Sequence, residues 1–116
     1  MTLLTVVSAP KPFTNPHIAM IQRNAIRSWL ELGDEVDVLL LGDEEGLAEN
    51  AAQLGVGYIP DVERNAYGTP LIRSLFRLAR DHNDSPLLMF VNTDILLQPH
   101  IMQAVRQSVV QTVPGM

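Results

Sequence analysis

Asn92, Thr93 and Asp94 form a polar triplet that directly follows an apolar run, residues 87–91. An ionised carboxylate inside such a run would be costly to bury unless it were paired, hydrogen-bonded or bound to a metal. We therefore predict that the run is a buried strand and that the triplet lies at its end, where Asp94 can bind a ligand or a cation. Two simpler alternatives are that Asp94 caps the following turn and that Asn92 forms an Asx-turn.

Four strand-like runs alternate with four helical patterns, and these elements must position the triplet. In a doubly wound sheet of strand order 3-2-1-4, the first and fourth strands are neighbours, and ligands bind beyond their carboxyl ends. Alternation of this kind favours a parallel sheet with helices on both faces, joined by right-handed crossovers. We predict one domain over residues 1–116, a doubly wound, mainly parallel, Rossmann-like α/β sheet of about four strands in the order 3-2-1-4. The strands are predicted at residues 3–8, 35–42, 56–60 and 86–91, and the helices at residues 16–32, 43–54, 69–81 and 98–109.

Two dipeptides mark helix starts. Asn15 is followed by Pro16, and Thr69 by Pro70, and each pair combines an N-cap side chain with a residue suited to the first helical position. The first and third helices are therefore predicted to begin at these prolines.

Four features of the chain occur together. They are a hydrophobic first strand ending in a loop of small residues and prolines, Asp43 after the second strand, Arg73 in the helix that opens with Thr69 and Pro70, and a strand ending in the triplet. Together they resemble the amino-terminal half of a GT-A glycosyltransferase, in the nucleotide-diphospho-sugar transferase superfamily. The resemblance covers nearly the whole chain. It implies a domain that binds a nucleotide-diphosphate sugar through a divalent metal, Mn²⁺ or Mg²⁺, and transfers the sugar to an unknown acceptor.

The triplet matches the Asp-x-Asp motif of that family. By this resemblance Asp94 is the metal ligand, and Asn92 and Thr93 contact the nucleotide sugar. A carboxylate and a hard cation would bridge the two phosphates of the donor and stabilise the charge that develops on the departing diphosphate. Asn92 replaces the first aspartate of the motif, so an oxygen acceptor is kept while a negative charge is lost. No catalytic residue is assigned.

The resemblance also assigns residues after the first two strands to the nucleotide. Ala9, Pro10 and Lys11 would form a preorganised wall against the base and ribose, and Lys11 would meet a phosphate. The alternatives are a simple chain exit and a solvated lysine. Asp43 would accept hydrogen bonds from the base or ribose, and it is also suited to cap the following helix. Both roles of Asp43 can hold at once.

Arg73 lies one turn into the third helix, where the resemblance places residues near the donor. Its guanidinium group suits a diphosphate because it can donate two parallel hydrogen bonds. The alternative is a solvated polar stripe that Arg73 shares with Arg77 and Arg80. Arg77 and Arg80 themselves are assigned to that solvated stripe.

Composition and missing motifs exclude some classes of function and argue against others. The chain has no cysteine, so disulfides, thiolate catalysis and zinc–thiolate sites are excluded. The net charge of −5 argues against a nucleic-acid surface. The glycine motifs of NTPases and dinucleotide-binding proteins and the G-x-S-x-G elbow of hydrolases are absent. No apolar stretch approaches the roughly 20 residues of a membrane span, and signal-peptide features are absent, so a cytoplasmic location is the default expectation.

In the GT-A family the acceptor site comes from chain beyond the metal motif, and few residues follow Asp94 here. Three interpretations stay open: the chain is a fragment of a longer protein, it finds its acceptor half in another subunit, or it is a catalytically silent nucleotide-binding or assembly module. The fourth strand would also be an apolar edge, and such edges invite pairing. We therefore expect a homo-oligomer or a missing second half paired through this strand, or coverage of the strand by the last helix.

Overall fold

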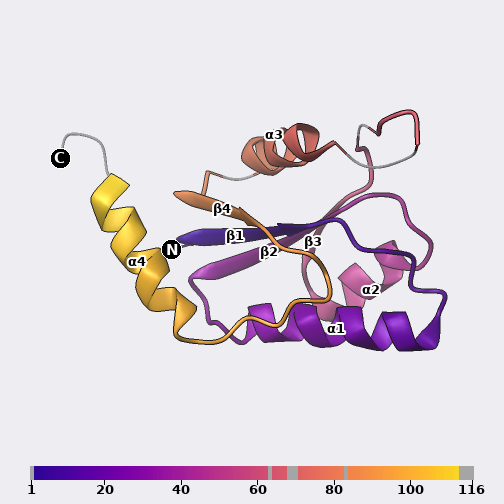
Figure 1. Cartoon of the computed structure of the whole chain (residues 1–116), viewed down its shortest axis with the longest axis horizontal. Coiled ribbons are helices and arrows are strands. Elements are labelled where there is room, and N and C mark those ends of the chain that lie inside the picture. Colours follow the sequence, from indigo (N-terminus) through magenta and orange to yellow (C-terminus); the bar gives the residue numbers. More distant parts are fainter. Residues whose placement is uncertain (1, 63, 68–70, 83, 113–116) are drawn as a thin grey trace.

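A computed structural model describes residues 2–62, 64–67, 71–82 and 84–112. Within this part of the chain, strands and helices alternate as the sequence predicts (Figure 1). The predicted start of the third helix at Thr69 and Pro70 lies outside the described residues. The elements are β1 (Leu4–Ser8), α1 (Pro16–Leu30), β2 (Val36–Leu41), α2 (Leu47–Leu54), β3 (Gly57–Ile59), α3 (Ile72–His82), β4 (Leu87–Phe90) and α4 (Ile101–Thr112).

The four strands form one all-parallel sheet in the order β3-β2-β1-β4. This confirms the predicted α/β fold class and strand order. β1 is central: Leu4 lies opposite Val36 of β2 on one side and opposite Leu87 of β4 on the other. The carboxyl ends of β1 and β4 are therefore adjacent, as the prediction of a shared ligand-binding rim requires.

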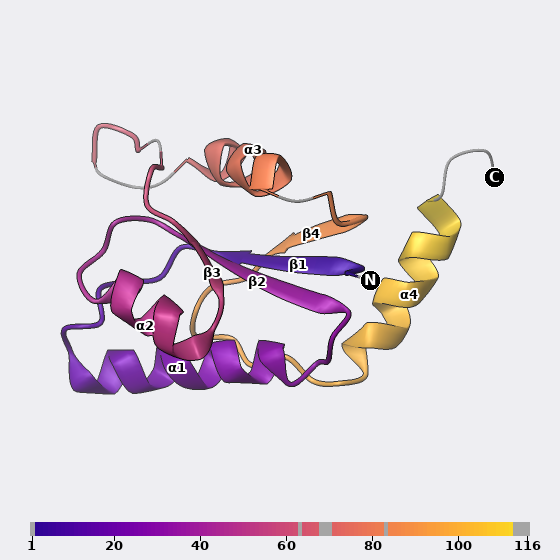
Figure 2. The ribbon, with the colours of Figure 1, turned by 180° about the vertical axis from the view of Figure 1, so that it is seen from behind.

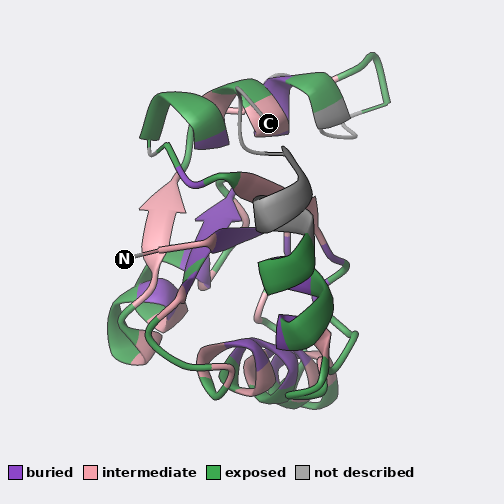
Figure 3. Cartoon of the chain, turned by 90° about the vertical axis from the view of Figure 1, so that its left-hand side faces the viewer, coloured by how far each residue is buried: buried purple, intermediate pink, exposed green. Residues whose placement is uncertain are grey.

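Helices cover both faces of the sheet. The helices α1 and α2 lie side by side on one face and α3 lies on the other (Figure 1, Figure 2). Seen along the sheet, α3 and α1 are separated by the strands and turn exposed surfaces outward (Figure 3). Successive residues of a strand point to opposite faces, so β1 serves two cores. Val6 packs with Trp29 in the larger core, and Val7 packs with Leu75 in the smaller one.

The cap predicted from the sequence is observed for α1 but not for α2. The side chain of Asn15 accepts hydrogen bonds from the main-chain nitrogens of His17 and Ile18, at 2.9 and 3.2 Å, which confirms the predicted cap of α1. The predicted cap of α2 is wrong. That helix begins at Leu47, after Gly46 in the left-handed conformation (φ +82°), and receives no side-chain cap. The carboxylate of Asp43 forms an ion pair instead, described below.

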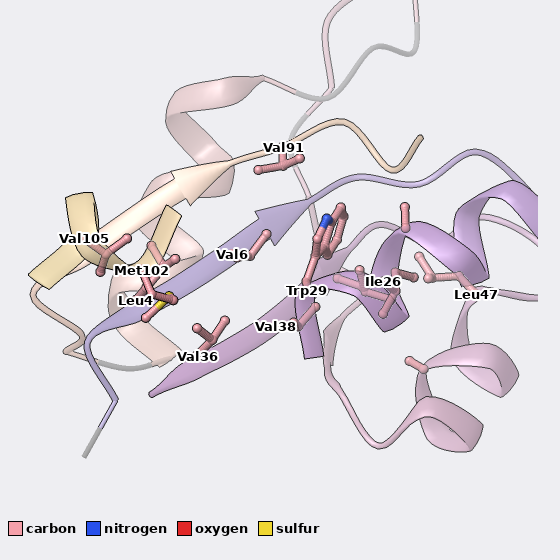
Figure 4. Close-up of a cluster of buried hydrophobic side chains, with 13 residues drawn as sticks. Leu4, Val6, Ile26, Trp29, Val36, Val38, Leu47, Val91, Met102 and Val105 are labelled. Atoms are coloured by element: carbon pink, nitrogen blue, oxygen red, sulfur yellow. The ribbon is translucent and has the colours of Figure 1, made fainter. Parts of the chain in front are cut away.

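The last helix begins later than predicted. Residues 98–100 form tight i to i+3 turns that lead into α4 at Ile101. The side chains of Met102 and Val105 then pack with Leu4 in the larger core, near the amino-terminal ends of the strands (Figure 4). β4 is an edge strand whose residues are only partly buried. Pairing of that edge with another chain stays a prediction. No helix in the described ranges has the length and apolar character needed to cross a membrane.

An ion pair fixes α4 to the sheet. The guanidinium of Arg106 donates two hydrogen bonds to Glu35, just before β2, the one from Nε at 3.1 Å. This hydrogen bond lowers the pKa of Glu35 below its ordinary value of 4.5, and the same contact raises the pKa of Arg106. A carboxylate with a lowered pKa stabilises the fold above its ordinary pKa, and the contribution is lost as the pH falls through the lowered value.

We therefore expect Arg106→Ala to lower the free energy of unfolding slightly at pH 7, because the pair is exposed and screened by salt. The free energies of unfolding of wild type and Arg106→Ala, measured in urea, should converge as the pH falls below the lowered pKa of Glu35. Glu35→Gln is the matched control. Its free energy of unfolding should likewise lack the pH dependence that the ion pair gives to wild type. A gap between wild type and Arg106→Ala that stays constant down to acid pH would contradict this role of the pair.

Candidate functional site

A pocket of about 350 Å³ lies at the carboxyl ends of β1 and β4, beside α1. Its volume is within the range of small-molecule sites. Five of the residues predicted from the sequence line it together, and three residues of α1 complete it. The lining consists of Ala9 and Lys11 after β1, Ile18, Ile21 and Gln22 of α1, and Asn92, Thr93 and Asp94 after β4.

The triplet leaves the sheet immediately after β4. The main-chain nitrogen of Val91 still bonds to β1, and a turn follows in which the nitrogen of Ile95 donates to the carbonyl oxygen of Asn92 at 3.1 Å. Asn92 and Asp94 are exposed. Among the described residues, neither of these two side chains has a hydrogen-bonding or ionic partner. The amide of Asn92 and the carboxylate of Asp94 are therefore available to a ligand.

Thr93 differs from its two neighbours because it is buried, with 6% of its surface exposed. The hydroxyl of Ser8, the last residue of β1, donates to the carbonyl oxygen of Val91 at 2.5 Å. Since a hydroxyl has one proton, the 2.5 Å contact between Ser8 and Thr93 is made by the Thr93 hydroxyl donating to Ser8. Thr93 thus joins the ends of β4 and β1 and sets where Asn92 and Asp94 lie. Sequence reasoning missed Ser8, although a hydroxyl at the end of a buried strand was a usable signal.

The loop after β1 is held by Gln22 of α1. The side-chain oxygen of Gln22 accepts from the main-chain nitrogen of Lys11 at 2.7 Å, and its nitrogen donates to the carbonyl oxygen of Lys11 at 3.0 Å. Gln22 is only 3% exposed. Pro10 is buried and does not line the pocket. Sequence reasoning also missed Gln22, whose signal was a polar residue on the buried stripe of α1 between Ile18 and Trp29.

The stretch after the triplet is attached to α1. The indole nitrogen of Trp29 donates to the carbonyl oxygen of Ile95 at 2.8 Å, and the nitrogen of Leu97 donates to the hydroxyl of Ser28 at 3.1 Å. Trp29 is fully buried beneath the sheet (Figure 4). The loop after β1 and the stretch after the triplet are therefore both hydrogen-bonded to α1.

Asp43 and Arg73 do not line the pocket. Asp43 follows β2 on the same rim, and its carboxylate pairs with Arg64 at 2.9 Å while its side chain stays 73% exposed. Arg64 also lies 3.3 Å from Glu44. Arg73 is exposed in the first turn of α3, on the face of the sheet opposite to α1. Arg64 was missed from the sequence because nothing near it in the chain indicates its partner.

No protein family, curated protein or solved structure matches this chain.

Among the described residues that line the pocket, the ionisable side chains are those of Lys11 and Asp94. Within the described ranges, no group of three or more histidine, cysteine or acidic residues could hold a metal by itself. Asp94 and the amide oxygen of Asn92 would supply two oxygen ligands. That number suits Mg²⁺ or Mn²⁺, because such ions usually complete their shell with water and substrate phosphates. The donor set thus fits a cation that arrives with a phosphorylated ligand.

Proposed function

We propose that this chain is a glycosyltransferase-type domain of the GT-A kind. It binds a nucleotide-diphosphate sugar through a divalent metal, Mn²⁺ or Mg²⁺, and transfers the sugar to an acceptor. The observation that carries the proposal is the pocket in which Asp94, Asn92 and Lys11 meet at the carboxyl ends of two adjacent parallel strands. Sheets of this type bind ligands at that position.

The side chains that remain available define what a ligand would meet. Asp94 and Asn92 offer oxygen atoms to a cation, and Lys11 offers positive charge to a phosphate. The cation, when bound, would offset negative charge on the departing diphosphate. Ile18 and Ile21 add an apolar wall from α1. Thr93 acts through its bond to Ser8, since its proton is already donated there.

In this proposal Asp43 and Arg73 lie outside the pocket and would contact only the parts of a ligand that extend beyond it. Asp43 would have to exchange its ion pair with Arg64 for a hydroxyl or N–H group of the nucleotide. Arg73 would reach only a ligand that extends past the rim toward α3. Ala9 lines the pocket directly, whereas Pro10 is buried and does not line it.

The alternative is a catalytically silent nucleotide-binding or assembly module. One observation favours it: Asp94 is the only acidic or imidazole side chain in the described lining. If Asp94 binds the metal, the pocket itself holds no general base for an acceptor hydroxyl. Transfer would then need a base from another subunit or another part of a longer chain.

The decisive experiment is calorimetric titration of UDP, GDP and their sugar conjugates, with and without MnCl₂. We expect one nucleotide to bind in a metal-dependent manner, and Asp94→Ala to weaken that binding by at least about tenfold, or 1.4 kcal/mol. Asn92→Asp should strengthen the metal dependence by restoring a charge. Asp81→Ala, which removes an exposed carboxylate on α3, is the matched control.

Three outcomes are informative. Equal metal-dependent binding by wild type and Asp94→Ala would contradict the role of Asp94. Binding without any sugar transfer or donor hydrolysis would favour the silent module. No binding of any nucleotide would overturn the donor site and leave an assembly role for the domain.

A further inference from the structure

Gln22 is a buried polar side chain whose amide oxygen and amide nitrogen both form hydrogen bonds with one residue of the pocket wall. It accepts from the nitrogen of Lys11 and donates to the carbonyl oxygen of the same residue. Lys11 is flanked by Pro10 and Pro12, which have no N–H group. Within residues 10–12, Lys11 is thus the only one whose main chain can donate a hydrogen bond, and that bond goes to Gln22.

We propose that Gln22 is a positioning residue of the nucleotide site. It holds Lys11 in the pocket lining by acting as acceptor and donor at once, and it thereby sets the affinity for the diphosphate. This inference rests on the proposed function. In this role Gln22 acts through Lys11, whose main chain it holds, and not through a contact of its own with the ligand.

The two-way hydrogen bond permits a sharp test with Gln22→Glu. An ionised glutamate can accept from the Lys11 nitrogen but cannot donate to the Lys11 carbonyl, and it places a negative oxygen against that carbonyl. A protonated glutamate has one O–H donor and one acceptor oxygen, so it can restore both bonds. Burial favours the protonated form. The variant should therefore regain its loop geometry as the pH is lowered.

Two native charged groups share the pocket lining with position 22, namely Lys11 on the loop and Asp94 on the triplet. The next residue of the helix, Arg23, bonds to Asn50 of α2. These groups are present in both wild type and variant, so the ratio of the two proteins' nucleotide affinities at each pH reports the effect of the new carboxyl group. Gln22→Met, which has a similar length and no hydrogen bond, should lose affinity at every pH. Gln103→Glu, exposed on α4, is the matched control.

The probe is UDP or GDP, whichever binds wild type more tightly, with MnCl₂, titrated at pH 5 and pH 8. At pH 8 we expect Gln22→Glu to bind at least about tenfold more weakly than wild type, and at pH 5 we expect most of that ratio to disappear. Amide hydrogen exchange of Lys11 should follow the same pattern. The amide of Leu40, in the centre of the sheet, should remain protected in all variants and so report that they are folded.

The failures of the two proposals can be told apart. If Gln22→Glu loses protection at Lys11 but binds the nucleotide as wild type does at pH 8, the positioning role is overturned while the donor site stands. If wild type itself binds neither nucleotide, the proposed function fails and the positioning role falls with it. Equal weakening of Gln22→Glu at both pH values, as in Gln22→Met, would overturn the two-way hydrogen bond as the cause.

Discussion

Replacing Trp29 with alanine is expected to lower the free energy of unfolding by about 3–5 kcal/mol. The indole is fully buried and packs with Val6 and Val38 in the larger core. Domains of this size are stable by only about 5–15 kcal/mol, so the variant should lose a large share of its stability. Circular dichroism in urea is the suitable measurement, because Trp29 is the only tryptophan and its fluorescence is lost with it.

Trp29→Phe separates packing from the hydrogen bond to the triplet loop. It keeps an aromatic ring in the core and removes the donor to the carbonyl oxygen of Ile95, at an expected cost of about 1–3 kcal/mol. Because that bond fixes the stretch after Asp94, nucleotide affinity should also fall. The control is Leu75→Ala, which damages the smaller core under α3 by about 2–5 kcal/mol. A folded Leu75→Ala that loses nucleotide affinity as strongly as Trp29→Phe would contradict a specific role for the loop anchor.

Features that depend on neighbouring residues could be predicted from the sequence. Alternating strands and helices predict a parallel sheet, and the doubly wound order 3-2-1-4 expected for such a sheet places β1 beside β4. The start of α1 follows from Asn15 and Pro16 because capping is a local interaction. The position of the triplet at the end of β4 follows from the cost of burying a carboxylate.

Features that depend on distant partners could not be predicted in this way. Asp43 has the residue type and position of a helix cap, yet its carboxylate pairs with Arg64, which lies 21 residues later in the chain. The site shows the same limit. The sequence indicates Lys11 and Thr93 as candidates, but the residues that fix them, Gln22 and Ser8, become visible only when the elements are packed. Local patterns thus predict which groups lie on the rim, and tertiary contacts decide which remain available to a ligand.

Removing the hydroxyl groups of Ser8 and Thr93 is the second change for which we expect a large loss of stability. Ser8→Ala should cost about 1–3 kcal/mol of unfolding free energy, because it leaves both the Val91 carbonyl and the Thr93 hydroxyl without their buried partner. Thr93→Val should cost less, since the bond from Ser8 to Val91 survives. The double variant should therefore be more stable than the sum of the single effects predicts, with a coupling of about 0.5–3 kcal/mol in urea unfolding.

A second hydroxyl pair at the opposite end of β4 provides the matched control for function. Thr5 of β1 lies 2.6 Å from Ser85, which precedes β4, so the two pairs bracket the same strand. Thr5→Val should therefore destabilise the fold much as Thr93→Val does. Only the pair at the carboxyl end sets the position of Asn92 and Asp94, so only Thr93→Val and Ser8→Ala should weaken metal-dependent nucleotide binding. If Thr5→Val weakens that binding equally at matched stability, the loss comes from a loosened strand and the local geometry of the triplet is not its cause.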